Sequence, residues 1–177
     1  LYGAGGDDIL DGGDFNDTLI GGAGYDRFFG GNNADTVDYF YLTNGGGVEI
    51  DLGAGTVTFP DGAEVPEPLE SIERAKGSAG PDILHGNWVD NQLYGREGDD
   101  VLYASNGNDR LAGQGGDDRF VFDGPVSGET QIYDWGLGQD ILDLGGLGAT
   151  TANTSLVRDG LHTLITVSTA PDLVIRV

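Results

Sequence analysis

The segments GREGDDVLY (95–103), ASNGNDRLA (104–112) and GQGGDDRFV (113–121) follow one another without a gap. Two further nine-residue segments precede them from Gly77, and four more fill residues 3–38. Across these nine segments, position 1 is Gly in eight, position 6 is Asp in eight, and position 8 is apolar in all nine. A fixed period of this kind is the sequence signature of a repeat architecture.

Each nine-residue segment encodes a turn followed by a very short strand. The first six positions are rich in small and polar residues, which suit turns with positive φ angles. The last three positions form a strand whose eighth-position side chain points inward. One unit cannot bury that side chain alone, whereas two units per coil, stacked on the next coil, build a continuous apolar column. The sequence therefore predicts an all-β fold, a right-handed parallel β-roll with two of these segments in each coil.

The predicted coil length brings acidic side chains together. Position-6 carboxylates that are two segments apart lie above one another, where their like charges repel. A hard divalent cation between them removes this repulsion, and Ca²⁺ accepts about six to eight oxygen ligands, including backbone carbonyls from glycine turns. Mg²⁺ fits less well because it keeps its waters and demands a smaller octahedron. The loop signature of EF-hands, D-x-[DN]-x-[DN]-G, is absent.

The composition favours cations as partners and excludes several other classes. The 177 residues include 30 acids and 8 bases, a net charge of −22, which argues against nucleic acid and anionic membranes as partners. There is no Cys, and His85 and His162 are too far apart for an H-E-x-x-H zinc helix. No apolar stretch reaches the ~18 residues of a membrane span. Apolar residues make up 38 %, which favours a packed core over disorder.

The repeats resemble the G-G-x-G-x-D-x-U-x nonapeptide of the RTX (repeats-in-toxin, haemolysin-type) calcium-binding β-rolls. The link between the two repeat blocks looks like the spacer that joins RTX blocks. The segments GGDDRFVFDG (115–124) and IYDWGLGQDILDLGGLG (132–148) are similar to the closing segment of serralysin-type proteases and of mannuronan epimerase R-modules. RTX modules accompany many different catalytic domains, so the resemblance implies no enzyme activity in this chain.

The resemblance implies calcium sites between coils, each fed by two position-6 side chains and their glycine turns. Up to about five Ca²⁺ ions are expected, which would change the net charge from −22 to −12 (−22 + 10). The implied pairs are Asp8 with Asp26, Asp17 with Asp35, Asp82 with Asp100, Asp100 with Asp118, and Asn91 with Asp109. The turn residues expected to contribute are Gly3, Gly5, Gly12, Gly21, Gly24, Asn33, Gly77, Gly80, Gly95, Gly98, Gly107, Gly113 and Gly116.

Some residues depart from the repeat or lie beside it. Phe15 and Val89 stand at position 4, where Gly is usual, so the two sites fed by their repeats are expected to be weaker, and Asn91 also removes a charge. The position-5 acids Asp7, Asp99 and Asp117 are expected to face solvent. For the closing-segment acids, a further ion and plain turn capping both stay open: Asp134, Asp140 and Asp143.

The predicted organisation has four parts: a first RTX block (1–38), a spacer (39–76), a second block (77–121), and a C-terminal cap and secretion-signal region (122–177). Strands are expected at 47–52, 56–59, 161–167 and 173–177, a loop at 60–68, and a strand in preference to a helical turn at 69–75. The step from Gly30 to Gly77 is 47 residues, two more than five repeats. Whether both blocks form one roll is therefore left open.

The resemblance implies the function of a non-catalytic calcium-binding module in a secreted or cell-surface bacterial protein. It would fold on extracellular Ca²⁺ and support secretion by the type I apparatus and stability of a longer protein, of which this Met-free chain is expected to be a fragment. Residues 170–177 read either as a capping strand or as a type I secretion signal. The rival is a polysaccharide-binding or adhesin module. It would use the aromatic side chains Trp88, Tyr94, Tyr103, Tyr133 and Trp135, although packing is the favoured role for these.

Overall fold

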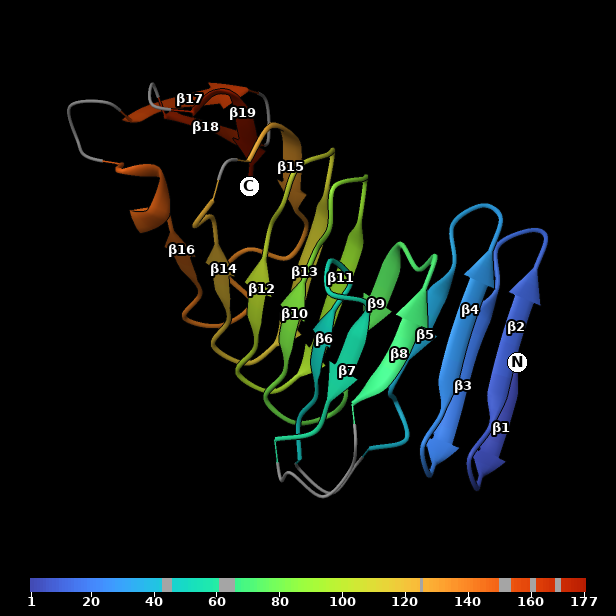
Figure 1. Cartoon of the computed structure of the whole chain (residues 1–177). Coiled ribbons are helices and arrows are strands. Elements are labelled where there is room, and N and C mark those ends of the chain that lie inside the picture. The colour runs from blue at the N-terminus through green and yellow to red at the C-terminus, as the bar shows by residue number, and fades with distance from the viewer. Residues whose placement is uncertain (43–45, 61–65, 125, 150–153, 160–161, 168–169) are drawn as a thin grey trace.

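The chain folds into a β-roll of about seven coils, in which two sheets face each other (Figure 1). The computed structural model describes residues 1–177 except 43–45, 61–65, 125, 150–153, 160–161 and 168–169. The first sheet contains, in spatial order, β1 (Tyr2–Gly5), β3 (Thr18–Ala23), β5 (Thr36–Asp38), β9 (Arg74–Lys76), β11 (Gln92–Glu97), β13 (Arg110–Gly115), β15 (Gly128–Ile132), β19 (Ala170–Arg176), β18 (His162–Val167) and β17 (Thr154–Asp159). The second contains β16 (Ile141–Asp143), β14 (Arg119–Val121), β12 (Val101–Tyr103), β10 (Ile83–His85), β6 (Glu49–Asp51), β7 (Thr56–Thr58), β8 (Glu67–Glu70), β4 (Arg27–Gly31) and β2 (Ile9–Gly13).

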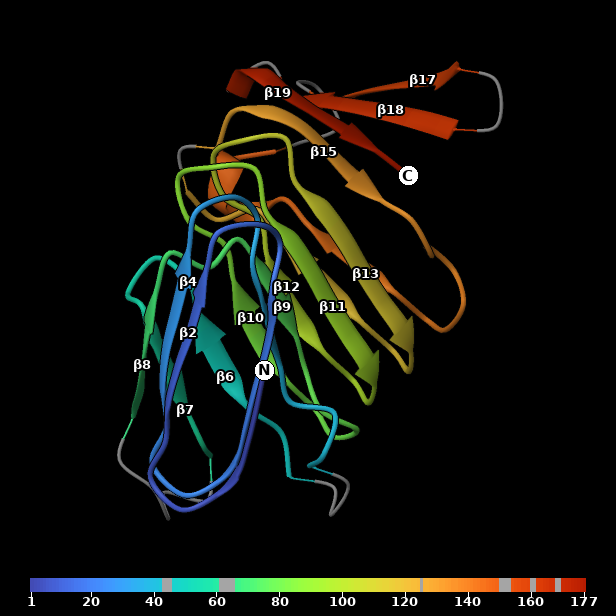
Figure 2. The same ribbon diagram turned by 90° about the vertical axis from the view of Figure 1, so that its right-hand side faces the viewer.

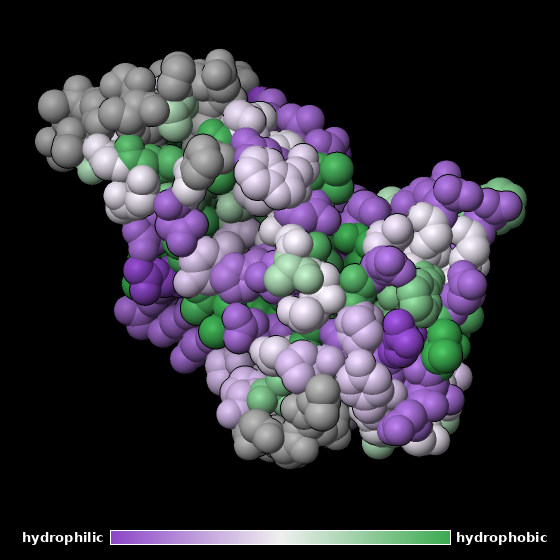
Figure 3. Space-filling view, in the orientation of Figure 1, coloured by the Kyte–Doolittle hydropathy of each residue, from purple (hydrophilic) through white to green (hydrophobic). Residues whose placement is uncertain are grey.

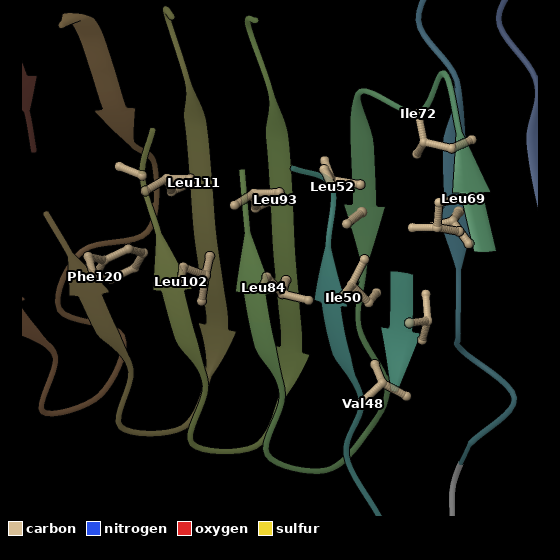
Figure 4. Packing of buried hydrophobic residues seen from close by; sticks show 14 of the residues in the cluster. Val48, Ile50, Leu52, Leu69, Ile72, Leu84, Leu93, Leu102, Leu111 and Phe120 are labelled. Carbon is tan, nitrogen blue, oxygen red and sulfur yellow. The ribbon is translucent and has the colours of Figure 1, made fainter. Parts of the chain in front are cut away.

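Strand register confirms the predicted coil length. Leu10 pairs with Phe28, and Leu93 pairs with Leu111, in each case two repeats further along the chain and in parallel. All nine position-8 side chains are buried, with Leu10, at 3 % exposure, the most accessible of them. Several of them point into the space between the sheets (Figure 4). Each fully buried side chain of this size contributes about 1.5–3 kcal/mol to the free energy of unfolding. The position-8 residues are therefore the main apolar core of the roll.

The spacer continues the stack, and both repeat blocks therefore belong to one roll. In the first sheet, β9 follows β5 directly, with Val37 paired to Ala75. In the second sheet, three strands (β8, β7 and β6) stand between β4 and β10, where one coil would supply one strand. Two extra strands widen this sheet by about 10 Å, because neighbouring strands lie ~4.8 Å apart. The strands β11 and β13 run obliquely to β2 and β4 (Figure 2).

Most of the strands expected outside the repeats are present. The segment 69–75 forms the end of β8 and the start of β9, joined by a bend at Ser71, which confirms a strand over a helical turn. The predicted loop 60–68 is wrong at its end, because Glu67 and Pro68 pair with β7 as part of β8; residues 61–65 lie outside the described chain.

At the C-terminal end, β18 and β19 confirm the two predicted strands, and β17 is an additional one. The strand β19 pairs in parallel with β15, and β18 and β17 continue the first sheet in antiparallel fashion. Ile165 and Ile175 are buried in the common core. These pairings satisfy the edge of β15, which would otherwise expose unpaired backbone groups. No helix within the described part of the chain is long and apolar enough to span a bilayer.

Close contact between coils explains the glycines at position 4. Gly116 has φ +133°, and a Cβ built on it would lie 2.0 Å from the carbonyl oxygen of Gly98 in the preceding coil. Gly6 has φ +99° but belongs to the first coil, so a Cβ there meets nothing within 4 Å.

Gly116→Ala is therefore expected to destabilise the calcium-saturated protein by more than about 2 kcal/mol, because backbone strain and a clash add together. Gly6→Ala should cost only about 1 kcal/mol, since strain acts alone. Thermal unfolding of both variants at saturating calcium compares them. Equal losses would show that the contact between coils is not what requires Gly116.

Candidate metal-binding columns

Position-6 residues form two columns, one at the start of each sheet's strands. In the second sheet, the backbone N–H of Asp82 donates to Asp100 Oδ1 at 2.8 Å, and the N–H of Asp100 donates to Asp118 Oδ1 at 3.0 Å. The same bond, from one coil to the carboxylate two repeats on, joins the other three predicted pairs at 2.7–2.9 Å. The structure thus brings together every predicted pair: Asp8–Asp26, Asp17–Asp35, Asp82–Asp100, Asp100–Asp118 and Asn91–Asp109.

These hydrogen bonds engage Oδ1 of each accepting Asp and leave its second carboxylate oxygen, Oδ2, to be satisfied in another way. Among the described residues, five buried Oδ2 atoms accept no hydrogen bond: those of Asp8, Asp17, Asp26, Asp35 and Asp100. A buried polar atom without a partner costs about 1–3 kcal/mol, and more if it is charged. A hard cation would supply the missing partner, so these residues fit Ca²⁺. No three His, Cys, Asp or Glu side chains converge within the part of the chain that the structure describes, so backbone carbonyls would complete the coordination.

The glycines at position 1 keep space open beside these oxygens. A Cβ on Gly95 would lie 1.9 Å from Asp100 Oδ2 and 2.9 Å from the carbonyl oxygen of Gly113 in the next coil. A Cβ on Gly77 would similarly lie 2.0 Å from Asp82 Oδ2 and 2.7 Å from the Gly95 carbonyl. A side chain at position 1 would therefore fill the space that a carboxylate and a carbonyl oxygen both border.

Burial opposes the charged form of these acids when no metal is bound. It raises the pKa of Asp100 to about 8, with the negative charges of Asp82 and Asp118 adding to the effect. Burial likewise raises the pKa of Asp109 and of Asp118 to about 6. The pKa values of Asp26 and Asp82 are also raised, mainly by burial. Only for Asp82, among these five acids, does a positive charge (Arg96) oppose this effect.

At three column positions the protein itself satisfies the oxygens. Ser78 donates to Asp82 through both its N–H and its Oγ, and Ser105 does the same for Asp109. Asn91 Oδ1 accepts the N–H of Asn87. Ala104, the one position-1 residue that is not Gly, directly precedes Ser105. These positions have less need of an ion than Asp100 has.

The two atypical turns differ from each other. Phe15 keeps a left-handed conformation with φ +80°, and Asp17 and Asp35 in its column still have unpartnered oxygens. Val89 and Gly80 are absent from the residues with positive φ, whereas Asn33 has φ +79°. In the first repeat, position 4 is Gly6; the expected ligand Gly5 is its neighbour at position 3, in β1.

Sequence reasoning missed two members of the columns. Asp26 N–H donates to Glu67 Oε1 at 3.3 Å, and Asp35 N–H donates to Glu73 Oε2 at 2.9 Å. Both Glu residues come from the spacer, at separations of 41 and 38 residues from their partners, so no nine-residue pattern marks them.

The closing-segment acids take different roles. Asp140 extends its column, because its Oδ1 accepts the Asp118 N–H at 3.1 Å. Asp134 instead caps the N–H groups of Gly113 and Gln114, and Asp143 pairs with Arg119. Asp143 Oδ1 also accepts the Gly145 N–H, so Asp134 and Asp143 both cap turns, and a further ion at these acids stays a prediction.

The position-5 acids lie outside the columns. Asp7, Asp99 and Asp117 are exposed, as predicted. Asp7 and Asp99 accept backbone N–H groups of the next coil, from Tyr25 and Asp117. These hydrogen bonds link the turns of successive coils on their exposed side, outside the buried sites.

The aromatic residues named for the polysaccharide-binding alternative are spread over both sheets, a turn between them and the closing segment. Tyr94 lies in β11 and Tyr103 in β12, on opposite sheets as predicted. The rings of Trp135 and Phe120 are 6.1 Å apart, so Trp135 packs against the core. Trp88, 78 % exposed, borders a cavity of about 210 Å³. The face drawn in Figure 3 is mostly hydrophilic, with small separate hydrophobic areas, and polysaccharide binding stays a prediction from sequence.

Comparison with known proteins identifies the repeats. The family model of the RTX calcium-binding nonapeptide repeat, in four copies, matches residues 2–37 and 85–120. Among solved structures, the extracellular lipase LipA from Serratia marcescens is similar, with 16 % identity and a TM-score of 0.34. The match covers 97 % of this chain but only 36 % of the lipase chain. No curated protein sequence matches the chain.

Proposed function

We propose that the roll is a non-catalytic module that folds when it meets extracellular calcium. The premise is that residues 2–37 and 85–120 carry RTX calcium-binding nonapeptide repeats. The observation that supports this most directly is the set of buried carboxylate oxygens without a hydrogen-bond donor. In this proposal the module is part of a longer secreted protein. It stays unfolded before export through a type I apparatus, and after export it folds on calcium and stabilises that protein.

Four pairs are the best candidates to hold Ca²⁺, because each contains at least one buried carboxylate oxygen without a hydrogen-bond partner. They are Asp8–Asp26, Asp17–Asp35, Asp82–Asp100 and Asp100–Asp118. Carbonyl groups of the position-1 glycines border the same spaces. The pair Asn91–Asp109 is a weaker candidate, since Ser105 and Asn87 already donate to it.

The mechanism is linkage between ion binding and folding. Without calcium, a net charge of −22 and stacked buried carboxylates oppose the compact state. Extracellular calcium modules bind with Kd values of about 10⁻⁴–10⁻³ M. At ten times Kd, each site adds about 1.4 kcal/mol to the free energy of unfolding. Four or five such sites are comparable with the whole stability of a small domain, about 5–15 kcal/mol.

A calcium titration of the metal-free chain, followed by far-ultraviolet circular dichroism, tests the proposal. We expect a cooperative coil-to-β transition at about 0.1–1 mM calcium. Magnesium at the same concentration should leave the chain unfolded, because it resists dehydration. A chain that shows full β structure in chelator at neutral pH would overturn the proposal.

A further inference from the structure

Glu73 occupies, in the spacer, the place that a position-6 Asp holds in the repeats. The strands β5 and β9 pair with Val37 opposite Ala75, and the same separation of 38 residues sets Asp35 opposite Glu73. The N–H of Asp35 donates to Glu73 Oε2 at 2.9 Å, as the N–H of Asp17 donates to Asp35 Oδ1 at 2.7 Å. Glu73 therefore continues the first-sheet column with a longer carboxylate side chain.

The spacer also supplies the backbone oxygen found at the repeat sites. A Cβ built on Gly12 would lie 2.6 Å from the carbonyl oxygen of Gly30, one coil later. A Cβ built on Gly30 would lie 1.9 Å from the carbonyl oxygen of Ser71, and 2.7 Å from Asp35 Oδ2. Ser71 thus takes the place of a position-1 residue although its sequence has no repeat character. Its φ of +54° accompanies the bend that brings it there.

The side chain aimed at this space has an oxygen without a partner. Asp35 is fully buried, at 0 % exposure, and its Oδ2 accepts no hydrogen bond. In the other column, Glu67 is placed differently, because its Oε1 accepts the Asp26 N–H and its Oε2 accepts the hydroxyl of buried Tyr39 at 2.5 Å. Glu67 therefore ends its column with both oxygens engaged. Glu73 instead accepts the N–H of Asp35, whose unpartnered Oδ2 borders the same space beside Gly30 as the Ser71 carbonyl.

We propose that Asp35, Glu73 and the Ser71 carbonyl form an additional divalent-cation site, which joins the first repeat block to the spacer. The inference rests on the proposed calcium binding and extends it beyond the segments that match the repeat family, since Ser71 and Glu73 lie outside them. The basic residue next to Glu73 in sequence, Arg74, directs its Nη1 to the Ala34 carbonyl at 3.2 Å.

Glu73→Gln tests the site, because it removes a charge while keeping an oxygen that can accept the Asp35 N–H. Glu70→Gln is the matched control: Glu70 is an exposed spacer residue three positions away, and its replacement changes the net charge equally. Native mass spectrometry of the folded, calcium-saturated proteins should count one ion fewer in E73Q than in the wild type, and the wild-type number in E70Q.

The outcomes separate this site from the general function. An unchanged ion count in E73Q would overturn the site and leave calcium-dependent folding intact. Absence of calcium binding in the wild type would overturn both. Should E73Q fail to fold, crystals of the wild-type protein soaked in Tb³⁺ decide the question. An anomalous peak between Asp35 and Glu73 supports the site, and peaks at repeat sites without one here overturn it.

Discussion

Asp100→Asn is expected to stabilise the metal-free roll and to weaken the calcium-loaded one. Asp100 belongs to two pairs, its Oδ2 is buried without a partner, and burial raises its pKa to about 8. Asn removes the buried charge but can still accept the Asp82 N–H, so the metal-free protein should gain about 1–3 kcal/mol. With calcium, two sites lose a carboxylate, and the calcium concentration at the folding midpoint should rise about tenfold, equivalent to ~1.4 kcal/mol.

Asp99→Asn is the control for that comparison, because it changes the same charge at an exposed neighbour that keeps its bond to the Asp117 N–H. Urea unfolding in chelator near pH 5, where acid is expected to fold the metal-free roll, gives the change in its free energy of unfolding for each variant. Urea unfolding at neutral pH, with calcium about tenfold above the folding midpoint, gives the corresponding change for the calcium-loaded roll. Destabilisation of D100N under both conditions would show that Asp100 is a structural hydrogen-bond acceptor and not a cation ligand.

Acid is expected to replace calcium as a promoter of folding in the metal-free protein. The pKa of Asp100 is about 8 in the folded state, and those of Asp109 and Asp118 are about 6, against an ordinary 3.8. A carboxyl whose pKa is higher in the folded state binds more protons folded than unfolded, so stability decreases as pH rises. The metal-free roll should therefore lose stability from about pH 4 to about pH 8, and most of its β structure should return near pH 5.

Calcium should invert this dependence, since the ions bind the deprotonated carboxylates and protons compete with them. Circular dichroism of resin-treated, metal-free protein across this pH range, repeated at saturating calcium, measures both profiles. A metal-free signal that does not change between pH 5 and pH 8 would mean that the column acids do not control folding. Asp143 provides an internal contrast, because its pKa is lowered by the Gly145 N–H and by Arg119.

The repeat period made the interior of the roll predictable. Position 8 recurs in every segment, so the buried positions of Leu93 and Leu111, and the pairing of Asp100 with Asp118, follow from the numbering alone. The spacer broke that logic, because the partners of Glu73 and Glu67 lie 38 and 41 residues away, where repeat partners lie 18 residues apart. A backbone carbonyl such as that of Ser71 leaves no trace in residue type, so only the coordinates reveal it.

Local substitutions limited the site prediction in a different way. Ser78 and Ser105, each one residue after position 1, place hydroxyl and N–H donors on Asp82 and Asp109. Nothing in the spacing shows that such a donor reaches the carboxylate four residues on. Phe15 shows the reverse case, because a bulky residue was expected to restrict the turn and yet adopts φ +80°.

The two extra strands that the spacer adds to the second sheet make the two sides of the roll unequal. In the first sheet, polar column residues succeed one another in every coil from Asp17 to Asp109. In the second sheet, the column stops at Glu67 and resumes at Asp82, whose Oδ1 accepts the N–H of apolar Val48. A roll with one continuous and one interrupted column of hydrogen-bonded polar residues bends most readily where the column is interrupted. We therefore expect tension on the two ends of the roll to separate the coils first at the spacer, on the side of the second sheet.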